Sequence, residues 1–117
     1  MKRILDRLWQ KLIALIHKGR CAKCNSTYLC SGHHIIKRRF HYVRWDADNG
    51  ILLCLTCHRW AEEHEKDFFT WLKMRYPKVY EWYDANRIPV TKRFASWEMR
   101  TLAQALREKI KYFTASS

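Results

Sequence analysis

Residues 21–57 read CAKCNSTYLCSGHHIIKRRFHYVRWDADNGILLCLTC, and this stretch decides the fold. It opens and closes with a Cys-x-x-Cys pair, Cys21 with Cys24 and Cys54 with Cys57. Two such pairs can converge on one ion to form the tetrahedral sulfur cage that Zn²⁺ prefers. Buried cysteines that only fill apolar space would not need this spacing. We therefore predict a structural zinc site that fastens the first pair to the second.

The cysteine count supports a metal site over a disulfide framework. The chain has five cysteines, an odd number, and the fifth, Cys30, lies outside both pairs. Cysteine pairs of this kind suit a reducing compartment, so we expect a cytoplasmic protein with Cys30 as a half-buried free thiol. In so small a domain, a bound zinc ion would supply a substantial part of the folding stability.

Composition limits the classes of function. With 117 residues the chain is too short for a large metabolic enzyme, and 48% hydrophobic residues exclude a disordered basic tail. The net charge of +12 favours a polyanionic partner, most simply nucleic acid. Charged residues interrupt the apolar stretch near the N-terminus, so we expect neither a signal peptide nor a membrane span. We predict a single domain over residues 1–117.

Hydrophobic periodicity outlines a mostly helical α+β protein. We expect a helix at about 3–18, a strand at about 28–36, a basic loop, a short strand at 51–53 and a helix from about 56 to 76 that Pro77 ends. A C-terminal helical extension covers about 66–113. The aromatic residues that begin at Phe68 are expected to pack against the N-terminal helix.

The stretch between the cysteine pairs resembles the HNH, or ββα-metal, endonuclease family in its zinc-stabilised phage and bacterial form. The matching segments are CAKC, HHIIKRR, RWDADNG and LLCLTCHRWAEEH, in that order, within about 21–64. The resemblance implies a small zinc-bound treble-clef (His-Me finger) core with flanking N- and C-terminal helices. It also implies hydrolysis of DNA phosphodiester bonds, as a nick or a double-strand cut, leaving a 5′-phosphate and a 3′-hydroxyl.

The resemblance assigns different roles to the histidines. Adjacent residues on a strand point to opposite faces, so His33 and His34 need separate roles. By resemblance, His34 is the general base that activates water, whereas His33 and His58 bind a catalytic divalent ion. The side chain or backbone of Asn49 would orient the general base across the hairpin, although an Asn-Gly pair can also serve only as a turn.

A third ligand of this ion is predicted from helix geometry. Glu62 lies four residues after His58 and shares its helix face, whereas His64 is rotated away, so we favour Glu62 over His64 or water. A carboxylate favours Mg²⁺ or Mn²⁺, with Zn²⁺ or Ni²⁺ as alternatives.

A basic loop follows the histidines. Its guanidinium and ammonium groups match phosphate oxygens, so we expect it to bind the DNA backbone rather than to form only a solvated surface. The predicted phosphate contacts are Lys37, Arg38, Arg39 and Arg44.

Two classes of function remain open. The first is a metal-dependent DNA endonuclease, acting as a monomer or a homodimer, in a bacterial cytoplasm and alongside phage packaging or recombination proteins. The second is a non-catalytic zinc module that binds nucleic acid or protein. A zinc-dependent deaminase is excluded because its His-x-Glu signature is absent.

Overall fold

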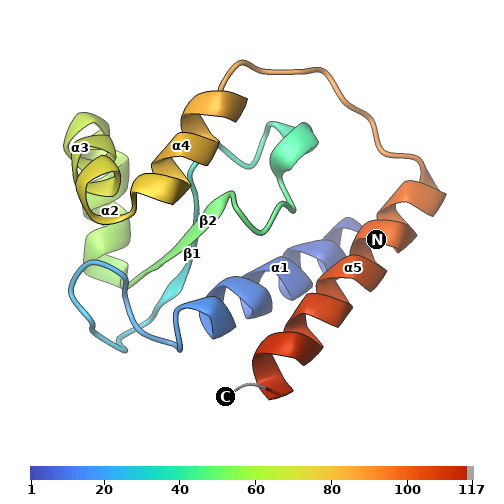
Figure 1. Ribbon diagram of the computed structural model, residues 1–117, viewed down its shortest axis with the longest axis horizontal. Helices are drawn as coiled ribbons and strands as arrows, with labels where there is room; N and C mark the ends of the chain where they lie inside the picture. The colour runs from blue at the N-terminus through green and yellow to red at the C-terminus, as the bar shows by residue number, and fades with distance from the viewer. Residues whose placement is uncertain (116–117) are drawn as a thin grey trace.

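The computed structural model describes residues 1–115, and residues 116–117 of the predicted domain 1–117 lie outside this range. Within it the chain is α+β and mostly helical, with a single two-stranded sheet (Figure 1). The elements are α1 (Lys2–Ile16), β1 (Ser31–His34), a 3₁₀ helix (His41–Val43), β2 (Gly50–Leu53), α2 (Leu55–Glu63), α3 (Glu65–Arg75), α4 (Pro77–Asn86) and α5 (Ser96–Ala115).

The two strands form an antiparallel hairpin that α1 secures from one side. The pairing runs from Ser31 opposite Leu53 to His34 opposite Gly50. The Gln10 side chain receives a hydrogen bond from the Gly32 N–H at 2.7 Å and donates one to the Gly32 carbonyl at 3.2 Å. Gln10 therefore satisfies backbone groups at the free edge of β1 as a third strand would.

Two glycines let α1 approach this hairpin closely. A Cβ atom on Gly32 would lie 2.7 Å from the Trp9 ring, and one on Gly50 would lie 2.5 Å from it. The ring itself is completely buried, and its Nε1 donates a hydrogen bond to the Asp46 carbonyl at 2.8 Å. Any larger residue at either position would push α1 away from the strands.

The core consists of two clusters. In the first, Leu5, Trp9 and Leu12 of α1 meet Ala103 and Leu106 of α5, and these two helices lie side by side in Figure 1. The second joins the sheet and the cysteine pairs to α2 and α3. Its members are Cys21, Ile35, Ile51, Leu53, Cys54, Cys57, Ala61, Phe68 and Leu72.

The structure corrects two of the predicted elements and the predicted packing of Phe68 against the N-terminal helix. The strand expected at about 28–36 is limited to β1, because Leu29 has a positive φ of 46° and lies in a turn. The helix expected over 56–76 is divided at His64, whose φ of −129° and ψ of 61° are not helical. Phe68 packs in the cluster beside the cysteines, whereas α5 packs against α1.

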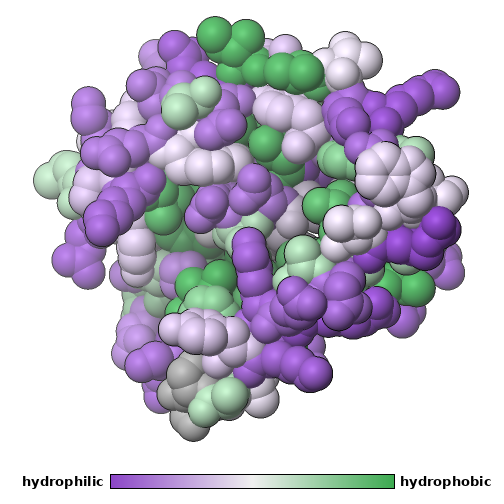
Figure 2. All heavy atoms as spheres, turned by 45° about the vertical axis from the view of Figure 1, so that its right-hand side comes forward, coloured by the Kyte–Doolittle hydropathy of each residue, from purple (hydrophilic) through white to green (hydrophobic). Residues whose placement is uncertain are grey.

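The surface is dominated by polar side chains. In the face shown in Figure 2, hydrophilic residues cover most of the area and apolar residues appear in smaller separate patches. Among residues 1–115, no helix has the length and apolar character needed to cross a membrane.

Candidate functional site

The two Cys-x-x-Cys pairs meet at the junction of the hairpin and α2. The sulfur atoms of Cys21, Cys24, Cys54 and Cys57 all lie within 4.8 Å of one another, and those of Cys24 and Cys54 are 3.5 Å apart. A tetrahedral Zn²⁺ with Zn–S bonds of about 2.3 Å needs sulfur atoms roughly 3.8 Å apart. The four cysteines are therefore placed to hold a metal ion, consistent with structural zinc, as the sequence predicted.

Backbone N–H groups favour a thiolate at Cys21 in this cluster. Burial by itself would raise the pKa of Cys21, but hydrogen bonds from the N–H groups of Cys24, Cys54 and Lys23 outweigh it and lower the pKa to about 7. Burial and the three neighbouring sulfur atoms raise the pKa of Cys57. Because nearby thiolates repel one another, a cation is the natural partner of this set.

Cys30 lies outside the four-cysteine cluster. Its thiol donates to the Ser26 carbonyl at 3.2 Å, and its side chain is half-buried at the edge of both core clusters. Burial raises the pKa of this thiol. It is a free thiol in the structure, as the sequence predicted.

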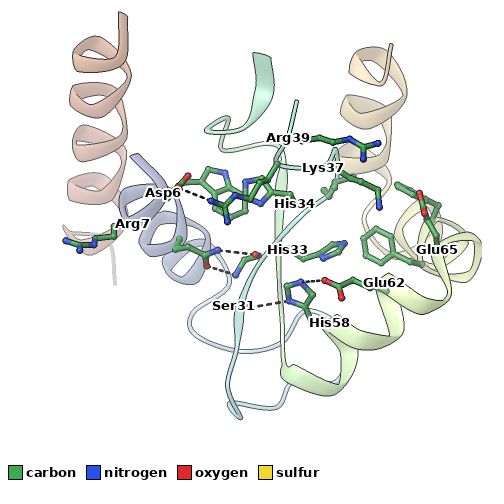
Figure 3. Close-up of a pocket in the computed structure, with 18 residues that line it drawn as sticks. Asp6, Arg7, Ser31, His33, His34, Lys37, Arg39, His58, Glu62 and Glu65 are labelled. Carbon is green, nitrogen blue, oxygen red and sulfur yellow. Dashed lines mark hydrogen bonds and ion pairs between the residues drawn. The ribbon is translucent and has the colours of Figure 1, made fainter. Parts of the chain in front are cut away.

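A second group of possible ligands lies between β1 and α2. One ligand atom from each of His33, His58 and Glu62 lies within 4.8 Å of the other two. His58 Nε2 is 3.3 Å from Glu62 Oε1, and its Nδ1 is 3.3 Å from the Ser31 hydroxyl (Figure 3). If Nδ1 donates to Ser31, the Nε2 lone pair faces a carboxylate oxygen. The lone pair and the carboxylate oxygen repel each other, and a divalent ion bound to both would relieve this repulsion. The three residues therefore fit a divalent metal ion.

The surroundings keep His33 uncharged, as metal ligation requires. Its ring packs edge-on against Phe68 and His58, with centroids 5.0 and 4.7 Å away. Burial, followed by the charges of His58, His34 and Lys37, lowers the pKa of His33 to about 3. A neutral imidazole retains a lone pair for a cation at physiological pH.

His34 points to the other face of the hairpin, toward α1. Its Nε2 lies 2.9 Å from the Arg44 carbonyl, which can only accept, so Nε2 carries the hydrogen and Nδ1 has the free lone pair. Among residues 1–115 no buried side-chain nitrogen or oxygen is without a partner, so solvent reaches this unpartnered Nδ1. Burial is the largest cause of the lowered pKa of His34, which favours the neutral, proton-accepting form.

The side chain of Asn49 holds the loop between the strands together by hydrogen bonds. Its side chain is completely buried, donates to the Ile36 and Val43 carbonyls and accepts from the Ile36 N–H. Its side chain makes no hydrogen bond to His34 that would orient the ring. By holding Val43 it instead fixes the segment whose next carbonyl, that of Arg44, binds His34.

Three of the four predicted phosphate contacts line one cleft with the histidines. This cleft has a volume of about 990 Å³, and Lys37, Arg38 and Arg39 border it. Arg44 requires a correction. It is 8% exposed, and its Nε and Nη2 donate to the two carboxylate oxygens of Asp6 at 3.1 and 2.8 Å. Its guanidinium is therefore used inside the protein rather than offered to a phosphate.

Sequence reasoning missed the contribution of α1 to this cleft. Asp6, Arg7, Trp9 and Gln10 form part of its lining, and Figure 3 shows Asp6 and Arg7 on the side opposite Glu62 and Glu65. The only sequence signal was a polar stripe on an otherwise apolar helix, which by itself resembles an ordinary solvated face. His64, the alternative ligand, lies at the junction of α2 and α3 and borders a different hollow with Tyr80 and Arg87.

Comparisons of the chain with protein-family models, curated proteins and solved structures find no match.

Proposed function

We propose that the protein is a metal-dependent DNA endonuclease of the HNH type, built on a zinc-stabilised treble-clef core. One observation carries the proposal: His34 and the group formed by His33, His58 and Glu62 line the same cleft. A general base beside a cation site is what hydrolysis of a phosphodiester requires.

His34 supplies the base. Its Nδ1 accepts a proton from water, whose oxygen then attacks the phosphorus. The bond from phosphorus to the 3′ oxygen breaks, and this oxygen takes a proton from solvent water. The products are a 5′-phosphate and a 3′-hydroxyl. The Arg44 carbonyl holds the ring through Nε2, which leaves Nδ1 as the proton acceptor.

The ligand group supports the second requirement. A divalent ion held by His33, His58 and Glu62 would supply positive charge to the phosphate and the leaving oxygen. The oxygen of Glu62 favours Mg²⁺ or Mn²⁺, and the two imidazoles also suit Zn²⁺ or Ni²⁺.

The basic border of the cleft supports DNA as the substrate. Lys37 and Arg39 are exposed and have no ion-pair partner among residues 1–115, so phosphate oxygens can reach them. Contacts of this kind carry little sequence information. We therefore expect salt-sensitive binding with weak sequence preference.

Supercoiled plasmid provides the test. The zinc-loaded native chain is incubated with Mg²⁺ or Mn²⁺ and should convert plasmid to nicked or linear DNA, whereas His34→Ala should be at least about 100-fold slower, the size of one general base. His64→Ala is the matched control and should retain full activity, since His64 lies outside the cleft.

The alternative function predicts a different outcome. His33 also packs edge-on against Phe68 and against His58, as it would in a zinc module that only binds. If the native chain bound DNA and zinc but cleaved nothing with any of the four ions, that binding module would replace the nuclease.

A further inference from the structure

The cleft is lined by charges of both signs. Glu62, one of the possible cation ligands, and Glu65 lie on the side of α2 and α3. Arg7 of α1 lies on the opposite side, whereas Lys37 and Arg39, in the loop after β1, lie on the same side as Glu65 (Figure 3). An extended polyanion entering this cleft would be attracted to Arg7 on one side and to Lys37 and Arg39 on the other, and repelled by Glu62 and Glu65 except where a cation is bound.

Arg7 differs from the other arginines near Asp6. Arg44 is buried and paired with Asp6 at 2.8 Å, and Arg38 approaches the same carboxylate at 3.4 Å. Arg7 is exposed and forms no ion pair among residues 1–115. Asp6 is thus satisfied without Arg7, which remains available to an external anion.

Further basic residues extend the α1 side of the cleft. Arg3 and Lys11 lie one turn before and one turn after Arg7, and all three are exposed. At 1.5 Å of rise per residue, Arg3 to Lys11 covers about 12 Å. One DNA strand advances about 3.4 Å per nucleotide along the duplex axis, so this row matches three to four consecutive nucleotides.

We propose that α1 is a second binding surface for the DNA backbone, in which Arg7, flanked by Arg3 and Lys11, contacts phosphates on the side of the cleft opposite the possible metal ligands. This inference rests on the proposed function and deepens it. The DNA strand crosses the cleft between α1 and the loop bearing Lys37 and Arg39, so its backbone passes over His34. The helix that anchors the hairpin internally then also positions the substrate.

The test is equilibrium binding in the absence of added divalent ions. A fluorescent duplex of about 25 base pairs is titrated with the zinc-loaded full chain at several KCl concentrations. Arg7→Gln should weaken binding about three- to tenfold at 100 mM salt and reduce the slope of log affinity against log salt by about one, the effect of one lost phosphate contact. Gln has a helix propensity close to that of Arg, so the melting temperature should not change.

The matched control is Arg75→Gln on α3. Arg75 is also exposed on a helix but lies outside the cleft, and this variant should bind as the native chain does. Native-like binding by Arg7→Gln, or an equal loss in Arg75→Gln, would overturn the inference. The latter would reveal an effect of net charge alone.

Binding and cleavage separate this inference from the proposed function. If Arg7→Gln weakens binding while the native chain never cuts plasmid, the DNA-binding surface on α1 is supported and the nuclease function is overturned. If the native chain cuts plasmid but Arg7→Gln binds normally, the nuclease function is supported and the DNA-binding surface on α1 is overturned. A native chain that does not bind DNA at all would overturn both.

Discussion

The indole of Trp9 lies flat against the imidazole of His34, with ring centroids 3.8 Å apart and planes 8° from parallel. Trp9 is completely buried, so the stack ties the proposed general base to the rigid interior of α1. The Arg44 carbonyl holds the same imidazole through Nε2. His34 is thereby fixed from two directions, which is the kind of support that a precisely oriented base needs.

Trp9→Phe should weaken both the fold and the proposed reaction. The smaller ring leaves space above the hairpin glycines and leaves the Asp46 carbonyl without its indole donor, so we expect a loss of about 2 kcal/mol in the free energy of unfolding. The nicking rate should fall while DNA affinity stays unchanged, because the ring that loses support is not a phosphate contact. Thermal melting and single-turnover nicking would measure the two effects.

Trp97→Phe is the control for this variant. Trp97 is 63% exposed at the start of α5, so its replacement should change neither the melting temperature nor the rate.

His34→Ala should lower the stability by about 1 kcal/mol or less, the value of one aromatic stack, while it removes activity. An unfolded His34→Ala protein would contradict a mainly chemical role for this residue.

The four-cysteine cluster makes a prediction about folding. Cys54→Ser removes one ligand and should leave a chain that does not fold, because a bound zinc ion contributes roughly 10 kcal/mol in small zinc domains. Circular dichroism and a chelator-release assay would show loss of helix and of one equivalent of zinc. Cys30→Ser should keep the zinc and melt normally, since a serine hydroxyl can still donate to the Ser26 carbonyl. Equal zinc loss from both variants would point to a different ligand set.

Sequence patterns were sufficient where a local rule decided the structure. Cys-x-x-Cys spacing predicted the sulfur cluster, and the four-residue spacing of His58 and Glu62 on a helix brought them to one face. The apolar stripe predicted α1 to within two residues at its C-terminal end, Ile16 against residue 18.

Long-range contacts decided the features that the sequence did not predict. Arg44 looks like part of a solvated basic loop, and only the fold brings Asp6 to its guanidinium. Asn49 looks like the first residue of a tight turn. Instead a long loop connects the strands, and the Asn49 side chain is buried inside this loop and holds it together. No glycine or proline marks the break at His64. A prediction from helix propensity alone therefore extends the helix through this residue.

The possible cation site can be tested without measuring cleavage. In the zinc-loaded protein, Glu62→Gln should weaken Mn²⁺ binding, followed by electron paramagnetic resonance, at least about tenfold, or ~1.4 kcal/mol. Glu63→Gln is the matched control, because Glu63 is the adjacent exposed carboxylate and lies outside the ligand group. Equal Mn²⁺ affinity in the two variants and the native chain would remove Glu62 from the site and leave the histidines to account for any binding.

The last prediction concerns Asp6, whose carboxylate joins α1 to the loop between the strands. Burial alone would raise the pKa of Asp6, but hydrogen bonds from Arg44 and Trp45 and the charges of Arg44 and Arg38 outweigh it and hold the pKa below its ordinary value of 3.8. A group with a lowered pKa in the folded state stabilises the fold above its unfolded pKa. That stability is lost as the pH falls through the folded pKa.

Asp6→Asn should therefore cost about 2 kcal/mol at pH 7, because Arg44 then keeps a buried charge without its anionic partner. The difference from the native chain should be constant above about pH 5 and shrink below pH 4, as Asp6 itself becomes protonated. Urea unfolding across this range measures it. Asp84→Asn breaks an exposed ion pair with Arg87 and should stay within about 0.5 kcal/mol of native at every pH. A gap for Asp6→Asn that grew on acidification would mean that the carboxylate is not the anion that holds this loop to α1.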